Sequence, residues 1–115
     1  MKNAEELDVF QKAHELTLEL YSLTKGFPKE EMYCLTSQIR RAAVSINTNL
    51  MEGSHRGSKP DYRRFVNIAR GSAGELKYLI RLSGDLGFIP KDRSIDLIRR
   101  LDVISKMLFG LQKAL

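Results

Sequence analysis

The fold is encoded most clearly by residues 58–87, which read SKPDYRRFVNIARGSAGELKYLIRLSGDLG. Apolar side chains recur here every three or four residues, the period of one face of an α-helix. Ser58 can accept a hydrogen bond as an N-cap, and Pro60 is tolerated in a first turn because its missing N–H has no intrahelical acceptor there. Gly87 suits the left-handed conformation that ends many helices. The stretch predicts one helix over residues 59–86, with an apolar side lined by Phe65, Ile68, Ala69, Leu76, Leu79, Ile80 and Leu86.

Two further amphipathic helices are predicted before this one in the sequence and one after it, and prolines and glycines mark their ends. They are predicted over about residues 6–25, 35–52 and 92–114. Their apolar sectors are lined by Val9, Phe10, Ala13, Leu16, Leu20, Tyr21 and Leu23, by Leu35, Ile39, Ala42, Ala43, Ile46 and Leu50, and by Leu97, Ile98, Leu101, Ile104, Leu108, Leu111 and Leu115. Gly53 is expected to cap the second helix of the chain, and Pro28 to begin a separate helical turn before it.

These patterns predict an all-α fold. No segment alternates apolar and polar residues between hairpin turns, so no strand is expected. Amphipathic helices joined by short loops cannot bury their apolar sides alone, and the economical arrangement is an antiparallel up-down-up-down four-helix bundle. We therefore expect a single bundle domain over residues 1–115.

Composition narrows the class of protein further. The chain has 115 residues, 43% of them hydrophobic, which is enough for one core without disulfides or a structural metal. Its single cysteine, Cys34, cannot form an internal disulfide, and the first ten residues carry acids where a secretory signal needs an apolar run. No stretch is long and apolar enough to span a membrane. We therefore expect a cytoplasmic protein without membrane contact.

Catalytic and metal-binding motifs are scarce. A di-iron site in a bundle needs a Glu-x-x-His pair on each of two helices, and the one such string, Glu52-Gly-Ser-His55, falls at a predicted helix end. Nothing local favours Cys34 as a nucleophile. Gly71-Ser-Ala-Gly74 resembles the GXXG clamp of KH domains only as a string, and inside a helix it indicates close approach by a neighbouring helix or chain. We expect no enzymatic activity, no cofactor and no metal site.

The most informative polar pattern is a line of cations on the helix predicted over residues 59–86. Five of them fall within a sector of about 40°, almost opposite the apolar side. We call this line the basic stripe: Lys59, Arg63, Arg70, Lys77 and Arg81. The acids Asp61 and Glu75 lie off the line, so the stripe is expected to be unneutralised along its own helix. Three more cations nearby in the sequence are candidate members of the same surface: Arg40, Arg41 and Arg56.

Three interpretations of this charge are open. The net charge of the chain is +5, and residues 40–81 contain nine basic and three acidic side chains. The stripe is then either a solvated face, or a partner for the acidic first helix, or a surface that follows the phosphates of structured RNA or other nucleic acid without reading bases. Base stacking is expected to be minor, because Tyr62 and Tyr78 lie off the stripe and the chain has no Trp.

Some apolar residues lie outside the predicted core-facing sectors. They are Leu7 and Leu18 in the first helix, and Val103, Met107 and Phe109 in the fourth. Scattered exposed apolar side chains are normal on a monomer. Widened apolar arcs on a small helical domain equally suit contact between copies of the chain. The sequence leaves both interpretations open.

Several blocks of sequence, in order, resemble a known family. The blocks are LDVFQKAHELTLELYSLTKGFPKEE, LTSQIRRAAVSI, NLMEGSHRGS, RRFVNIARGSAGEL and DLGFI, between Leu7 and Ile89. They are similar to the bacterial four-helix-bundle proteins named for 23S ribosomal RNA intervening sequences. The family motif maps onto Gln38, Arg40, Arg41, Asn49, Glu52, Gly53, Arg56, Arg70, Gly71, Ser72 and Glu75.

The resemblance carries its own expectations. It implies a bundle assembled into a homo-oligomer, with a ring of five as the family's suggested number. It also implies kinship with basic accessory proteins of diversity-generating retroelements, which bind nucleic acid and a reverse transcriptase. It establishes no catalysis. Arg40 or Arg41 paired with Glu52 or Glu75 would hold the second and third helices together.

The leading hypothesis is a non-enzymatic homo-oligomer that binds structured RNA or other nucleic acid through the basic stripe. The alternative is a protein-interaction scaffold or accessory subunit whose basic face docks an acidic protein surface, or the acidic first helix of a neighbouring copy.

Overall fold

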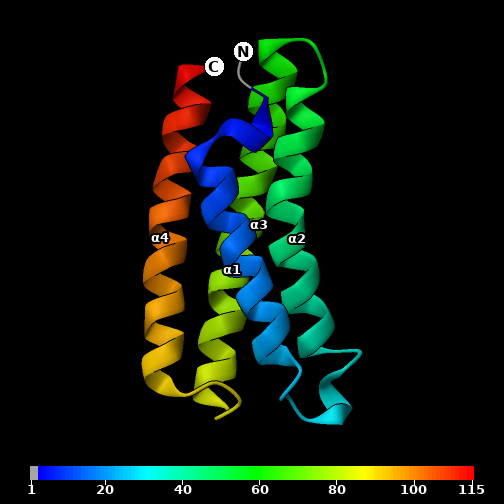
Figure 1. Ribbon diagram of the computed structural model, residues 1–115, viewed down its shortest axis with the longest axis vertical. Coiled ribbons are helices and arrows are strands. Elements are labelled where there is room, and N and C mark those ends of the chain that lie inside the picture. Colours follow the sequence, from blue (N-terminus) through cyan, green and yellow to red (C-terminus); the bar gives the residue numbers. More distant parts are fainter. Residues whose placement is uncertain (1–2) are drawn as a thin grey trace.

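The computed structural model describes residues 3–115, which form a four-helix bundle (Figure 1). The long helices are α1 (Asp8–Thr24), α2 (Leu35–Ser54), α3 (Lys59–Asp85) and α4 (Lys91–Ala114), with short 3-10 turns η1 (Ala4–Glu6) and η2 (Lys29–Glu31). The described residues contain no strand, and successive helices run in opposite directions, which confirms the predicted fold. The separate turn before α2 is η2, as predicted. α1 begins later than predicted because Leu7 is extended and divides η1 from α1.

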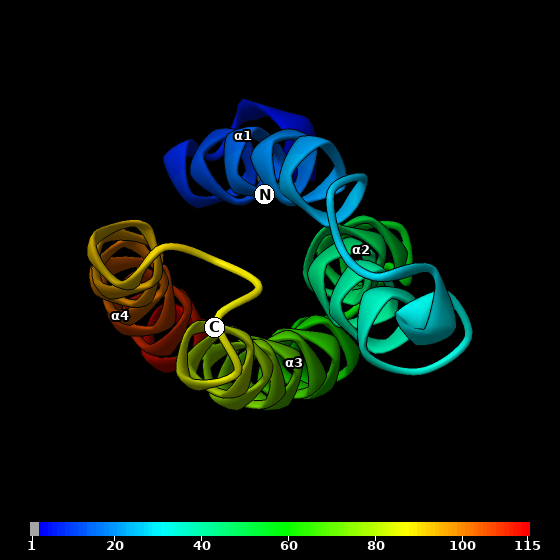
Figure 2. The same ribbon diagram turned by 90° about the horizontal axis from the view of Figure 1, so that it is seen from below.

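The order of the helices along the chain is also their order of packing. α2 packs against α1 and α3, and α3 packs against α4, whereas the seam between α1 and α4 is the most sparsely packed. Viewed from one end, the helices form an arc whose two ends are α1 and α4 (Figure 2). The bundle extends 43 × 24 × 19 Å. α3 makes the two most extensive helix pairings, so its orientation controls how the other helices are placed.

Most of the predicted core is buried, including Leu16, Ile39 and Leu76. Three predicted core residues are instead exposed, namely Tyr21, Ile68 and Leu86. Five buried residues of α3 lie outside its predicted apolar side: Tyr62, Val66, Ala73, Ser83 and Gly84. The reason is that α3 has α2 on one side and α4 on the other, so its buried arc is turned toward α4 relative to the apolar sector read from the sequence.

The helix ends match the predicted signals at two of three positions. The Ser58 hydroxyl accepts a hydrogen bond from the backbone N–H of Asp61 at 3.2 Å, and Gly87 has a φ of 81°. The prediction that Gly53 caps α2 is wrong, because Gly53 is buried inside the last turn of that helix. The left-handed residue of this connection is Gly57, with a φ of 85°.

The buried glycines mark where the helices touch most closely. A Cβ on Gly53 would lie 2.8 Å from Cβ of Phe65 and 3.0 Å from Cδ1 of Tyr62, so only glycine lets α2 meet α3 there. A Cβ on Gly84 would lie 2.6 Å from Oγ of Ser94 in α4. Gly71 and Gly74 have no such neighbour within 4 Å among the described residues. The prediction that they admit a neighbouring helix is therefore wrong within one chain.

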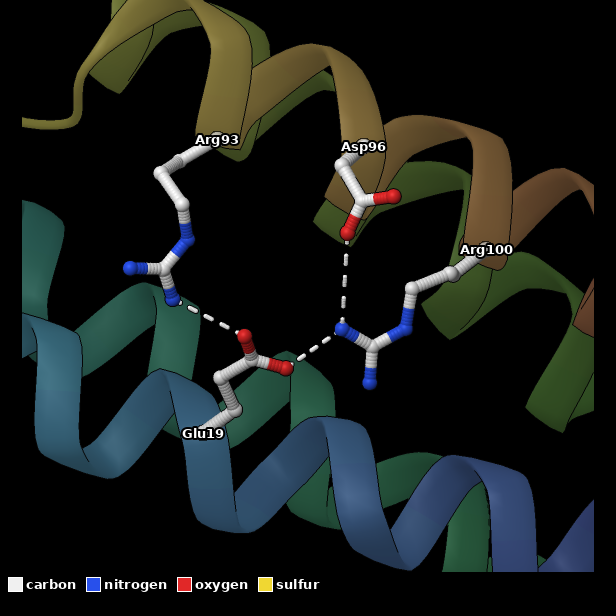
Figure 3. Close-up of polar contacts among 4 residues, drawn as sticks. All are labelled: Glu19, Arg93, Asp96 and Arg100. Atoms are coloured by element: carbon white, nitrogen blue, oxygen red, sulfur yellow. Dashed lines mark hydrogen bonds and ion pairs between the residues drawn. The ribbon is translucent and has the colours of Figure 1, made fainter.

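One polar cluster bridges the sparse seam between α1 and α4 (Figure 3). Glu19 of α1 accepts a hydrogen bond on Oε1 from Nη2 of Arg93 at 2.8 Å, and its Oε2 accepts one from Nη1 of Arg100. Arg100 is also 3.7 Å from Oδ2 of Asp96 on its own helix. A single carboxylate of α1 thus holds two guanidiniums of α4, and this joins the two ends of the arc.

The Glu19 cluster also changes the acidity of its carboxyl group. Partial burial of Glu19 raises its pKa, but the hydrogen bonds and positive charges of Arg100 and Arg93 outweigh burial, so the pKa is lowered from its ordinary value of 4.5. A lowered pKa in the folded protein means that the folded state favours the charged carboxylate. The stabilisation is therefore complete above pH 4.5 and is lost as the pH falls through the folded pKa.

We expect glycine-to-alanine changes on two helices to have opposite effects. Gly53→Ala should lower the free energy of unfolding by about 1–3 kcal/mol, because the new methyl collides with Phe65 and Tyr62. Gly71→Ala is the matched control and should raise it by up to about 1 kcal/mol, because alanine is the better helix former and nothing lies nearby. Urea denaturation measures both. Equal effects of the two changes would contradict the close approach at Gly53.

Removal of the Glu19 charge should destabilise the bundle in a pH-dependent way. Glu19→Gln should lower the free energy of unfolding near pH 7, because it removes the ion pairs with Arg93 and Arg100. The loss should be only about 1 kcal/mol, because the arginines are partly exposed to water. The difference from the unmodified chain should shrink as the pH falls below 4.5. Glu15→Gln removes the same charge from an exposed position of α1 that has no ion pair within residues 3–115, and should have little effect. A pH-independent loss for Glu19→Gln would contradict the assignment.

Candidate functional site

The basic stripe lies along the seam between α3 and α4, and not opposite the buried face as predicted. Arg63 donates from Nη2 to the backbone oxygen of Leu115 at 2.6 Å. Arg70 donates from Nη1 to Oε1 of Gln112 at 2.9 Å, and Nζ of Lys77 is 2.9 Å from Oδ1 of Asp102. The stripe flanks the buried face because the packing of α3 against α4 turns this side of the helix toward its neighbour. The same contacts set α3 and α4 in register along their length.

The stripe is partly neutralised, which corrects a second expectation. Lys77 pairs with Asp102 of α4, and Nε of Arg81 lies 4.0 Å from Oδ2 of Asp85, one turn further along α3. Lys59 forms no ion pair within residues 3–115. Arg70 bonds to the uncharged amide oxygen of Gln112 and Arg63 to the backbone oxygen of Leu115, and each keeps most of its five N–H donors for other partners. The stripe therefore links α3 to α4 and still has guanidinium N–H donors that can bond to other partners.

The three additional candidate cations do not all join this surface. Arg40 points to α1, where Nε donates to Oγ1 of Thr24 at 2.9 Å and Nη2 to the backbone oxygen of Tyr21 at 3.3 Å. Arg56 pairs with Glu52 at 3.2 Å. Arg41 is exposed on α2, which packs on the opposite side of α3 from α4. Arg40 and Arg41 are therefore separated from the seam that carries the stripe.

The predicted ion pairs between α2 and α3 are also wrong. Glu52 bonds to Arg56 just beyond its own helix, and Arg40 is held by α1. The polar link between α2 and α3 is a hydrogen bond of 2.7 Å between the hydroxyls of Ser45 and Ser72.

A second row of cations on α4 was missed by the sequence analysis. It consists of Arg99, Lys106 and Lys113, which are exposed and spaced by seven residues, or about 10 Å each. None of the three forms an ion pair in the described part of the chain. Their seven-residue spacing is the signal by which the sequence alone could have shown this row.

The row on α4 lies beside the stripe on α3. Arg99 is three residues before Asp102, the partner of Lys77, and residues three apart are neighbours on a helix surface. Lys113 lies over the ring of Phe109, as Arg70 does from α3. We call the combined surface the α3/α4 basic face: Arg63, Arg70, Lys77, Arg99, Lys106 and Lys113. Asp102 is the acid that the observed contacts place on this face.

Other functional chemistry has little support in the described residues. Residues 3–115 contain no group of three or more His, Cys, Asp and Glu side chains placed to hold a metal ion. Cys34 is exposed, and Nδ1 of His55 lies 2.9 Å from the backbone oxygen of Met51. Tyr62 is buried, which raises its pKa and removes its ring from any stacking surface. No helix in this part of the chain has the length and apolar character needed to cross a membrane.

Comparisons with known proteins identify the family. The bundle is similar to a solved structure of a protein with unknown function from the S23 ribosomal protein family of Bacteroides thetaiotaomicron VPI-5482, with a TM-score of 0.83. The two share 24% identity over 91% of this chain and 98% of that chain, so the likeness shows the fold alone. No curated protein matches the chain. The sequence model of the 23S rRNA-intervening sequence proteins matches residues 5–110, so the chain belongs to the 23S rRNA-intervening sequence protein family.

Proposed function

We propose that this protein is a non-enzymatic nucleic-acid-binding protein that holds the phosphates of structured RNA or other nucleic acid on the α3/α4 basic face. The observation that carries the proposal is the pairing of two cation rows on adjacent antiparallel helices, with Asp102 as the acid among them. Nucleic acids carry closely spaced phosphates, and cations that neutralise them release counterions, which drives binding. Such contacts position a ligand without reading its sequence.

The two rows contribute differently to this surface. In the row on α3, Lys77 is paired with an acid, and Arg63 and Arg70 each use donors within the bundle. The row on α4 is exposed and without ion pairs within residues 3–115, so its charges need not break an internal contact before they meet a phosphate. The α4 row should therefore supply most of the electrostatic affinity, while α3 supplies guanidinium donors in a fixed position.

Assembly of several copies would strengthen binding by this surface. We propose a homo-oligomer, with a ring of five subunits as the family resemblance implies. Two apolar side chains support contact between copies, because Leu18 is 59% exposed on α1 and Val103 is 45% exposed on α4. Each subunit of an oligomer would add a basic face, so one long nucleic acid could contact several faces at once.

A second candidate function rests on the acids of the first helical segment. Glu5, Glu6, Asp8 and Glu15 are exposed and form no ion pair in the described chain, and only Glu19 has arginine partners there. The basic face of one copy could therefore dock this acidic segment of another copy, or an acidic surface of a different protein. In that case the chain is a protein-interaction scaffold.

Loss of the α4 row should weaken nucleic-acid binding more than an equal loss of charge elsewhere. We expect the triple change Arg99→Gln, Lys106→Gln and Lys113→Gln to lower affinity for a structured RNA at least tenfold at about 50 mM salt, and to reduce the salt slope by about two to three. The control is the triple change Lys12→Gln, Lys25→Gln and Lys29→Gln, which removes the same charge from exposed positions on α1 and the following loop. Fluorescence anisotropy at about 50 and 200 mM salt measures both.

Three results would contradict the proposal. If the unmodified protein has no affinity for RNA, the basic face serves another partner. If both triple variants lose affinity equally, net charge and not the α3/α4 basic face carries the binding. A strict monomer at micromolar concentration, measured by light scattering after size exclusion, would contradict the assembly.

A further inference from the structure

Phe109 is an unusual feature of the α3/α4 basic face. Its side chain is 47% exposed on α4, whereas Phe27 and Phe65 are buried. A phenylalanine has no polar group to offset this exposure, so contact of its ring with water is unfavourable. From the sequence alone, Phe109 is one of the apolar residues of the fourth helix, and the aromatic residues near the basic stripe are Tyr62 and Tyr78.

Two cations lie against the exposed ring of Phe109. The guanidinium carbon of Arg70 lies 4.7 Å from the ring centroid, and Nζ of Lys113 lies 5.2 Å from it. Lys106 is three residues before Phe109 on the same helix and is therefore its neighbour on the surface. An aromatic ring with positive charge on several sides combines the two features by which proteins hold unpaired nucleotides, a flat stacking surface and contacts to phosphates.

The end of the α3/α4 basic face that carries Phe109 also lacks acidic side chains. Residues 62–74 of α3 and 103–115 of α4 contain no Asp or Glu, and they lie side by side because Arg63 bonds to Leu115 and Arg70 to Gln112. Further along the helices, the acids Asp85 and Asp102 neutralise Arg81 and Lys77. The two segments around Phe109 therefore contribute basic side chains without acidic ones.

The exposed ring of Tyr21 lacks this setting. Tyr21 is 38% exposed on α1 with the guanidinium of Arg40 4.7 Å from its ring centroid, but Arg40 is held there by two hydrogen bonds to α1. Lys113, in contrast, forms no ion pair within residues 3–115, so it can leave the Phe109 ring without breaking one. Arg70 stays beside Phe109 because Gln112 holds it.

We propose that an unpaired nucleobase stacks on Phe109, with its flanking phosphates on Arg63, Lys106 and Lys113. The inference rests on the proposed function and names its ligand class, which is a single-stranded segment such as the loop or bulge of a folded RNA. Bases inside a duplex are already stacked on both faces and cannot reach the ring, whereas splayed bases of loops can stack on aromatic side chains and arginine planes. No contact to a 2′-hydroxyl is part of the proposal, so single-stranded DNA should bind comparably.

The test compares three fluorescently labelled ligands of equal length: single-stranded RNA, single-stranded DNA and duplex RNA. The unmodified protein should bind both single strands more tightly than the duplex. Phe109→Leu should lower affinity for the single strands about fivefold or more, because base stacking is lost. It should leave duplex binding and the salt slope unchanged, because no charge is removed. Phe109→Tyr should retain the affinity, since it keeps an aromatic ring.

Tyr21→Leu is the matched control, because it removes a partly exposed aromatic ring that also lies beside an arginine but outside the α3/α4 basic face. It should leave all three affinities unchanged. Thermal unfolding and light scattering of each variant show whether it folds and assembles as the unmodified chain does.

The possible outcomes separate this inference from the proposed function. Suppose that the unmodified protein binds nucleic acid and that the Phe109→Leu variant binds single strands as tightly as the unmodified protein. Stacking on Phe109 is then wrong and the electrostatic function stands. If the unmodified protein binds the duplex more tightly than the single strands, stacking on Phe109 is also wrong and the electrostatic function stands. If Phe109→Leu changes the oligomer mass and leaves affinity intact, Phe109 belongs to a subunit contact. If no ligand binds to the unmodified protein, both proposals fail.

Discussion

The close packing of α3 against both of its neighbours is the constraint on which the rest of the structure depends. α2 can approach α3 because Gly53 leaves room for Phe65 and Tyr62, and α4 can approach because Gly84 leaves room for Ser94. Close-packed interiors tolerate little change in volume, so these two contacts hold α3 in one rotation about its axis. That rotation brings Arg63, Arg70 and Lys77 to the seam with α4. The α3/α4 basic face is therefore a consequence of how tightly the helices pack.

The charges of α4 are divided between two tasks by the sides of the helix on which they lie. Arg93 and Arg100 face α1 and are held by Glu19, where they join the two ends of the arc (Figure 3). Arg99, Lys106 and Lys113 are exposed and have no acidic partner within residues 3–115. A charge that an ion pair already neutralises attracts a further anion more weakly than an unpaired one. Paired and unpaired cations thus lie on different sides of one helix.

The sequence predicted much of the fold and only part of the candidate site. The N-cap at Ser58, the left-handed Gly87 and the four apolar periods are local signals, because each depends on residues within a turn or two. The stripe was also read correctly as a line along one helix. Its partners were not, because Asp102 and Gln112 are distant in sequence and reach α3 only through packing. Arg40 was misassigned for the same reason, since nothing local indicates that it bonds to Thr24.

The amino-acid sequence by itself determined the all-α class, the number and approximate limits of the helices, the family and the presence of a basic stripe. Periodicity and capping chemistry act over a few residues, so they can be read along one chain. Only the tertiary structure decided which side of α3 meets α4, which cations are engaged, and that Arg70 and Lys113 converge on Phe109. A helical period leaves the choice of neighbour and the register between helices open. These are decided by side-chain packing and close contacts at glycine, which act between residues far apart in the sequence.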